Sequence, residues 1–317
     1  MDEMSLRNST HVARVDAVLR RVLLAFVEVF PARACSVYIE GSFADGSGIS
    51  SSDLDLKIIL KDSFIDVEEQ NRAAEFMQFA TTLAPLELDI EVIDEQSLLG
   101  GVSPLLKLGS LLVYGEDMLQ DKPIVPLIQW ARDRMHSSYW RTIHLFGRSL
   151  PLHSPLTFPD PAAEFYGYDR RKWRLENGEE VNCTRDLIRL VSWSATGILA
   201  FKAGRYVVRK RDCHKVYQAC FSDEWGQLLQ DIYELCRNKW HYLIPVQADE
   251  RRALRAICER TLAFENHFLQ IYKEFLLQEL SRADPQGQQF ALDVLRRFPY
   301  QDAELEQAIR SCSPPTA

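Results

Sequence analysis

Residues 38–60, "YIEGSFADGSGISSSDLDLKIIL", contain the pattern that decides the fold. A short β-rich run ends in Gly41 and Ser42, ten residues follow, and two aspartates, Asp53 and Asp55, then stand inside an apolar strand. Side chains two positions apart on a strand share one face, with Cβ atoms roughly 6–7 Å apart. The stretch therefore predicts two carboxylates aimed at one point, on a strand whose opposite face is apolar and packs on a core.

Two carboxylates so close repel each other unless a cation lies between them, and a divalent metal ion is the usual cation. Oxygen-only ligands favour Mg²⁺ or Mn²⁺ over zinc. A second expected strand, residues 85–94, offers Asp89, flanked by Glu87 and Glu91. If the two strands are neighbours, three carboxylates can hold two Mg²⁺ about 3.5–4 Å apart, which suits in-line phosphoryl displacement. We expect Asp89 to be the third carboxylate, with Glu87 and Glu91 as alternatives.

The Gly-Ser pair adds a phosphate site to these carboxylates. Gly41 lets a phosphate approach the backbone closely, and Ser42 offers a hydroxyl and a backbone N–H at the turn. Alternating aspartates on an exposed strand face are common, and Gly-Ser turns are commoner still. The combination, followed by a second strand with a central aspartate, predicts a site for a nucleotide and its metal ions.

Composition limits the remaining choices. The chain has 317 residues, enough for two domains, and its 46% hydrophobic and 26% charged residues are typical of a folded protein. Its formal net charge of −8 gives no general attraction to nucleic acid, so such a partner is not favoured, although one with a small footprint stays open. The absence of a long apolar run and of a leader pattern predicts a cytoplasmic chain that makes no membrane contact. The seven cysteines contain no C-x-x-C pair, which argues against a disulfide framework and a zinc ribbon.

The chain divides by pattern into four parts. Residues 1–120 are expected to form an α/β catalytic domain, with a helix over 9–30 capped by Ser9 or Thr10, two strands, a helix over 67–83 and a third strand. A connector or insertion is expected at 121–183, a helical domain at 184–300 and a C-terminal tail at 301–317. The expected helices of the helical domain are residues 184–203, 211–220, 224–241, 248–280 and 287–297.

The opening stretch resembles the signature of the DNA polymerase beta-type nucleotidyltransferase superfamily: an apolar run, Gly-Ser, a variable loop, and Asp-apolar-Asp. This resemblance implies that Asp53, Asp55 and Asp89 bind the metal ions and that Gly41 and Ser42 contact the nucleoside triphosphate. It also implies a fold: an α/β N-terminal nucleotidyltransferase domain, with a small mixed sheet flanked by helices, and an all-α helical-bundle C-terminal domain.

The layout is similar to that of the streptomycin/spectinomycin-type aminoglycoside adenylyltransferases. "LKLGSLLVYGEDML", residues 106–119, resembles their helix-to-loop element that ends in Tyr-Gly. Residues 183–217 resemble their helix, Gly turn and Ser-Lys helix start, with Arg209-Lys210 where Ser-Lys is usual. The resemblance implies that Lys210 reaches the nucleotide phosphates. The third-strand carboxylate of these relatives is generally Glu, so the general base stays open between Asp89 and Glu91.

Two further groups of residues are candidates for contacts with the substrates. Trp173 with Glu179 and Glu180 would suit a polycationic sugar, and the resemblance implies an acceptor held by acidic residues and a tryptophan near this position. A basic cluster admits three interpretations: a solvated helix start, cations that offset triphosphate charge, or an RNA contact. It consists of Lys202, Arg205, Arg209, Lys210, Arg211 and Lys215. The histidines at 136, 144 and 153 are expected on the surface or among aromatic rings rather than as metal ligands.

Together these patterns predict a Mg²⁺-dependent enzyme that moves AMP from ATP to a hydroxyl of a small molecule. An aminoglycoside is the leading acceptor, which would make the protein an antibiotic-resistance enzyme. The alternatives are transfer to RNA, protein or another nucleotide, and a non-catalytic nucleotide-binding protein. The sequence does not distinguish a monomer from a dimer.

Overall fold

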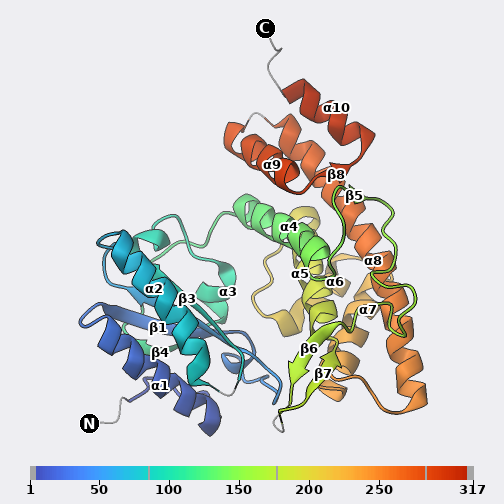
Figure 1. Ribbon diagram of the computed structural model, residues 1–317. Helices are drawn as coiled ribbons and strands as arrows, with labels where there is room; N and C mark the ends of the chain where they lie inside the picture. Colours follow the sequence, from blue (N-terminus) through green and yellow to red (C-terminus); the bar gives the residue numbers. More distant parts are fainter. Residues whose placement is uncertain (1–4, 85, 176–177, 283, 313–317) are drawn as a thin grey trace. The chain divides into compact units, whose positions relative to one another are not determined.

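The computed structural model describes residues 5–84, 86–175, 178–282 and 284–312. These residues form two compact units (Figure 1). Unit 1 comprises Met1–Pro126 together with Val207–Arg211, and unit 2 comprises Leu127–Tyr206 and Asp212–Ala317. A short segment of the later chain therefore belongs to the N-terminal unit.

Unit 1 is built on a four-stranded mixed sheet. The sheet order is β3-β2-β1-β4, with β1 antiparallel to β2 and β4, and β2 parallel to β3. Parallel neighbours need a crossover connection, which α2 provides between β2 and β3. The helices and strands of the unit are α1 (Ala13–Val29), β1 (Ala34–Glu40), β2 (Leu54–Leu60), α2 (Val67–Ala80), β3 (Leu88–Asp94), α3 (Pro104–Gly109) and β4 (Leu111–Gly115). Short 3₁₀ turns cover Gly41–Phe43, Thr81–Leu83 and Glu95–Leu98.

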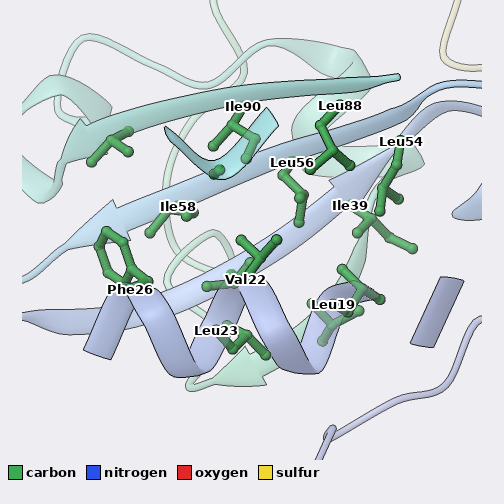
Figure 2. Close-up of a cluster of buried hydrophobic side chains, with 14 of the residues drawn as sticks. Leu19, Val22, Leu23, Phe26, Ile39, Leu54, Leu56, Ile58, Leu88 and Ile90 are labelled. Atoms are coloured by element: carbon green, nitrogen blue, oxygen red, sulfur yellow. The ribbon is translucent and has the colours of Figure 1, made fainter. Parts of the chain in front are cut away.

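One face of this sheet packs on the main core with α1 and α2. Figure 2 shows side chains of α1, among them Val22 and Phe26, directed toward side chains of the strands such as Leu56 and Ile58. The alternation predicted for the second strand is confirmed, because its apolar positions are at most 3% exposed: Leu54, Leu56, Ile58 and Leu60. Burial of such side chains contributes roughly 1.5–3 kcal/mol each, which holds β2 firmly in place.

The opposite face of the sheet carries a second, smaller core over part of its length. Tyr38 of β1 and Ile59 of β2 pack there against residues that follow β3: Leu98, Val102, Leu106 and Leu119. This apolar cover lies toward the end of β2 that contains Ile59. The other end of the same face carries acidic side chains, described below.

Two local details of unit 1 differ from the sequence-based expectation. The run 111–115, which lies inside the segment that resembles a helix-to-loop element, forms β4, an edge strand that pairs with β1. Helix α1 starts at Ala13 rather than near residue 9, and its N-cap position, Val12, has no side-chain cap. Ser9 and Thr10 instead donate hydrogen bonds to the carboxylate of Asp16, at 2.6 and 2.7 Å.

Unit 2 is largely helical. Five of its helices lie in the predicted ranges: α5 (Arg185–Ala203), α6 (Cys213–Cys220), α7 (Trp225–Asp231), α8 (Ala248–Ser281) and α9 (Pro285–Arg297). The first helix, α4 (Leu127–His144), lies in the expected connector, and the last is α10 (Ala303–Cys312). A π-helix, Ile232–Lys239, continues α7, and the strands are β5 (Leu152–His153), β6 (Arg171–Arg174), β7 (Glu180–Cys183) and β8 (Tyr300–Gln301). Helix α10 lies within the predicted tail, whose last residues, 313–317, are outside the described part of the chain.

The fold class predicted from the sequence is confirmed: a small mixed sheet with helices comes first, and a helical region follows. Across the described ranges, every helix is too short or too polar to serve as a membrane span.

Candidate functional site in unit 1

The acidic residues predicted from the sequence lie at one end of a single sheet face. In β2 this face carries Asp55, Lys57 and Ile59 in turn, because side chains alternate along a strand. The register pairs Asp55 with Glu40 of β1 on one side and with Asp89 of β3 on the other. The face therefore changes from apolar at Ile59 to acidic at Asp55.

Asp53 immediately precedes β2, and the backbone N–H of Leu54 bonds the carbonyl of Glu87 at 2.9 Å. The site thus draws its carboxylates from the starts of two parallel strands and from the end of β1.

The electrostatics of Asp55 show that these groups act on one another. Burial is the largest cause that raises the pKa of Asp55, to about 6, and the Lys210 cation opposes it. Negative charges raise this pKa further, from Asp53, Asp89 and Glu40. Like charges that raise the pKa of a neighbour are typical of functional sites, where the protein tolerates repulsion that an ordinary surface would relax.

Gly41 makes room for the Asp55 carboxylate. The residue begins the 3₁₀ turn after β1 and has a φ of +73°, which L side chains rarely adopt. A Cβ atom at this position would lie 2.6 Å from Oδ2 of Asp55. The next residue, Ser42, is half-buried in the same turn. Gly41 of the predicted Gly-Ser turn therefore lies close to Asp55 of the predicted aspartate pair.

Lys210 comes to this site from the segment Val207–Arg211, which the fold assigns to unit 1. Its charge is the main one that lowers the pKa of Asp55. The Lys210 side chain is exposed, whereas Val207, three residues earlier, is buried. A residue that the resemblance to the adenylyltransferases singled out thus lies beside the carboxylates.

The alternatives for the third carboxylate have different surroundings. Asp89 is the register neighbour of Asp55, and it is exposed. Glu91 is also exposed but forms an ion pair with Lys57, its own register neighbour. Of the two, Asp89 faces the acidic end of the sheet, and Glu91 is already paired with a cation of the protein.

Three residues of this region are not identified by the sequence pattern. Glu40 is the last residue of β1, and its position two residues after Tyr38 on the same face was a usable signal. Asp45 and Arg211 form an ion pair, with Nε and Oδ2 3.4 Å apart. In the sequence Arg211 is one member of a basic cluster, and no pattern connects it to Asp45.

The candidate metal ligands are the carboxylates of Asp53, Asp55 and Asp89, which offer oxygen donors only. Oxygen donors are the ligands that Mg²⁺ prefers. Within the described ranges, no three His, Cys, Asp or Glu side chains are placed so that they could jointly hold a metal ion. Asp53 and Asp89 are nevertheless close enough to Asp55 for their charges to raise its pKa.

The residues proposed for the acceptor lie in unit 2, on the β6–β7 hairpin. Trp173 is paired with Val181, and Arg185 places its guanidinium 5.0 Å from the centroid of the Trp173 ring. Glu179 and Glu180 are both exposed, and Glu180 pairs in register with Arg174. Residues 176–177, between β6 and β7 in the sequence, are outside the described residues. A cation of the protein itself therefore lies over the aromatic ring.

The other cations of the basic cluster divide into two groups. Lys202 forms an ion pair with Glu274, and Nζ of Lys215 lies 3.9 Å from Oδ1 of Asp212. Arg205 and Arg209 are exposed. Two of the predicted non-ligand histidines, His136 and His144, lie among aromatic rings of unit 2, as expected.

Comparison with known proteins gives a likeness at the level of structure. The chain resembles a solved adenyltransferase. The spectinomycin adenyltransferase AAD(9) from Enterococcus faecialis, solved with ATP and spectinomycin, matches 81% of this chain and 100% of its own, with 13% identity and a TM-score of 0.43. No protein-family model matches the chain, and no curated protein sequence does.

Two further solved structures resemble it more weakly. A toxin–antitoxin structure with AMP-PNP matches 39% of this chain and 94% of its own, with 13% identity and a TM-score of 0.24. The cyclic dinucleotide synthase CdnE from Elizabethkingia meningoseptica, with GTP and Apcpp, matches 81% and 94%, with 10% identity and a TM-score of 0.26.

Proposed function

We propose that the chain is a nucleotidyltransferase that moves AMP from ATP to a hydroxyl group of a small molecule. The supporting observation is the gathering of like charges: Asp53 and Asp89 both act on Asp55 at one end of a sheet face. On an ordinary surface strand, carboxylates gathered beside a positive-φ glycine would only repel one another. Proteins accept such local destabilisation mainly where a ligand compensates for it.

In this proposal Asp53, Asp55 and Asp89 hold two Mg²⁺. The metal ions would neutralise triphosphate charge and polarise the phosphorus that is attacked. Gly41 and Ser42 bind phosphate oxygens through the turn that follows β1. The closeness of Gly41 to the Asp55 carboxylate supports this role.

The residues of the chain then divide the chemical work. Asp89 accepts the proton of the acceptor hydroxyl, and the oxygen attacks the α-phosphorus in line. The new oxygen–phosphorus bond forms as the bond to pyrophosphate breaks. Lys210 offsets the charge that builds up on the departing pyrophosphate. Glu91 is the alternative base, and its ion pair with Lys57 makes it the weaker candidate.

The leading acceptor class is a hydroxylated cationic small molecule such as an aminoglycoside, and the corresponding biological role is antibiotic resistance. The exposed carboxylates of Glu179 and Glu180 support this class, with Trp173 on the preceding strand. These three residues would hold the acceptor.

A second acceptor class is favoured by a specific observation in the same hairpin. Strand β6 reads Arg171-Lys172-Trp173-Arg174, and Arg185 lies over the Trp173 ring. Arginine stacked on an aromatic ring is a common feature of sites that bind phosphates and bases. Transfer of AMP to RNA or to another nucleotide is therefore the second candidate, and transfer to protein is a further branch of it.

Incubation with labelled nucleotides tests the proposal. The purified chain is mixed with Mg²⁺, with ATP, GTP, CTP or UTP, and with separate panels of aminoglycosides, nucleotides and short RNAs. The mass of every acceptor is then measured. We expect AMP to be added to a small hydroxylated acceptor, the reaction to stop with EDTA, Asp53→Asn to be inactive, and Glu68→Gln, an exposed change elsewhere in unit 1, to behave as wild type.

Two outcomes would contradict transfer. If the chain binds ATP with Mg²⁺ in calorimetry but modifies no acceptor, it is a non-catalytic nucleotide-binding protein. If it binds no nucleotide at all, the proposed role of Asp53, Asp55 and Asp89 is wrong.

A further inference from the structure

Asp45 connects the loop after the Gly-Ser turn to the segment that carries Lys210. Nη1 of Arg211 donates a hydrogen bond to the carbonyl oxygen of Asp45 at 3.2 Å, and Nε of Arg211 lies 3.4 Å from Oδ2 of Asp45. The other carboxylate oxygen of Asp45 accepts the backbone N–H of Ser47 at 2.9 Å. One side chain therefore contacts both the loop and the segment.

This ion pair is partly removed from water. The Asp45 side chain is 6% exposed and the Arg211 side chain 33% exposed. A carboxylate that is nearly inaccessible needs a partner, because an unpaired buried charge is strongly unfavourable. Arg211 provides that partner: its Nε faces the carboxylate, while its Nη1 bonds the carbonyl oxygen of the same residue. A planar guanidinium holds two such contacts in a defined orientation.

The rest of the segment is seated against unit 1 by packing. Val207 is 2% exposed. The carbonyl oxygen of Val208 lies so near Gly109 that a Cβ atom there would be 2.8 Å from it. The segment is thus held at its start by packing and at its end by Arg211. Lys210, with an exposed and flexible side chain, lies between these two attachments.

We propose that Asp45 and Arg211 are a positioning pair for Lys210, an inference that rests on the proposed nucleotidyl transfer. Asp45 holds Arg211, and Arg211 fixes the backbone from which Lys210 faces the carboxylates and the bound triphosphate. The pair touches no substrate itself. By the same contact, Asp45 ties the placement of Lys210 to the loop that leads into Asp53, so that both sides of the phosphate site form together.

A competing role for Arg211 is direct contact with the triphosphate. The two roles predict different couplings with Lys210. If Arg211 acts only through Lys210, Arg211→Gln does not change nucleotide affinity in a variant that lacks the Lys210 side chain. If Arg211 contacts phosphate independently, Arg211→Gln weakens affinity by the same factor with and without that side chain. A double-mutant cycle distinguishes them.

The experiment measures the dissociation constant for a non-hydrolysable ATP analogue by calorimetry, and kcat/KM for transfer, in wild type, Lys210→Ala, Arg211→Gln and the double variant. A hydrogen-bonded charge on phosphate contributes roughly 10- to 150-fold in affinity, so Lys210→Ala sets that scale. We expect Arg211→Gln to weaken analogue binding about tenfold in the wild-type background and less than twofold in the Lys210→Ala background. Asp45→Asn should behave like Arg211→Gln.

Controls separate positioning from unfolding and from general loss of charge. Thermal melting checks that each variant is folded, and Arg211→Gln, at a partly exposed site, keeps the test valid if Asp45→Asn does not fold. Lys215→Gln removes a cation four residues further along whose side chain is 70% exposed, and it should leave both constants within twofold of wild type.

Each result decides the matter. Effects of Arg211→Gln and Lys210→Ala that multiply in the double variant would overturn the positioning role and leave nucleotidyl transfer intact. Wild-type affinity in Arg211→Gln would also overturn it. A wild-type chain that binds no ATP analogue would overturn both the positioning role and the proposed function, a failure visible before any variant is made.

Discussion

Oδ2 of Asp55 lies where a side chain at Gly41 would have to be, 2.6 Å from the position of a Cβ atom. The turn after β1 and strand β2 therefore approach each other closely at the Asp55 carboxylate. Because Gly41 also has a φ of +73°, the position excludes other residues for two separate reasons.

Gly41→Ala is expected to reduce transfer strongly and to destabilise unit 1. A positive φ costs an alanine about 1–2 kcal/mol, and the added methyl group also displaces the Asp55 carboxylate. Transfer rates and the free energy of unfolding in urea are the measurements.

Gly46→Ala is the matched control, since Gly46 has the same φ of +73° but no atom within 4 Å of an added Cβ. It should show the backbone penalty alone, with transfer close to wild type. Equal loss of activity in the two variants would mean that contact with Asp55 is not what requires glycine at position 41.

Asp55→Asn is expected to abolish transfer and to stabilise the protein in the absence of nucleotide and metal ions. Burial and the neighbouring charges of Asp53 and Asp89 make the ionised form of Asp55 unfavourable, which is why its pKa rises to about 6. Removing the charge should add roughly 1–3 kcal/mol to the free energy of unfolding at pH 7. Asp62→Asn, at an exposed position of unit 1, should change stability by less than about 0.5 kcal/mol.

The measurement is thermal and urea unfolding in EDTA, with transfer assayed separately in Mg²⁺. An Asp55→Asn variant that melts below wild type would show that the carboxylate stabilises the fold and is not held there against repulsion.

Asp89→Asn and Glu91→Gln test which acidic residue of β3 takes part in the reaction. Loss of a general base lowers kcat by about 10²- to 10⁴-fold, and we expect this loss for Asp89→Asn. Glu91 is held by Lys57, so Glu91→Gln should leave kcat within about threefold of wild type. The reverse order of the two effects would transfer the role of base to Glu91.

Some of this site follows from the sequence because it depends on local rules. The alternation along residues 53–60 determines which side chains are buried, and strand geometry then places Asp53 and Asp55 near each other. The sequence pattern also predicts Asp89 as the third carboxylate. Only the parallel register of β2 and β3 shows that Asp89 lies beside Asp55 while Glu91 lies beside Lys57.

Other features have no local signal. Arg211 and Asp45 are far apart in the chain, and the Asp45–Arg211 contact exists because the segment Val207–Arg211 packs on unit 1. Strand β4 is a five-residue apolar run, too short for its periodicity to identify it as a strand.

The ion pair between Arg33 and Glu69 gives unit 1 a stability that depends on pH. Nε and Nη2 of Arg33 donate to the two carboxylate oxygens of Glu69, both at 3.0 Å, and the N–H of Ile65 donates to Oε2 at 2.7 Å. Burial alone raises the pKa of Glu69, but these hydrogen bonds outweigh it and hold the pKa below its usual value of 4.5.

Because the folded-state pKa of Glu69 is the lower one, the unfolded chain binds the proton more tightly. The stabilisation is therefore complete above about pH 4.5 and is lost as the pH falls through the folded-state value. We expect Glu69→Gln to reduce the free energy of unfolding by about 2–3 kcal/mol at pH 7 and by much less near pH 3, as measured by urea unfolding at both pH values. Glu68→Gln changes the exposed neighbour and should show no such pH-dependent difference. A Glu69→Gln deficit that stays constant from pH 7 to pH 3 would show that the residue stabilises α2 by packing and that its charge contributes nothing.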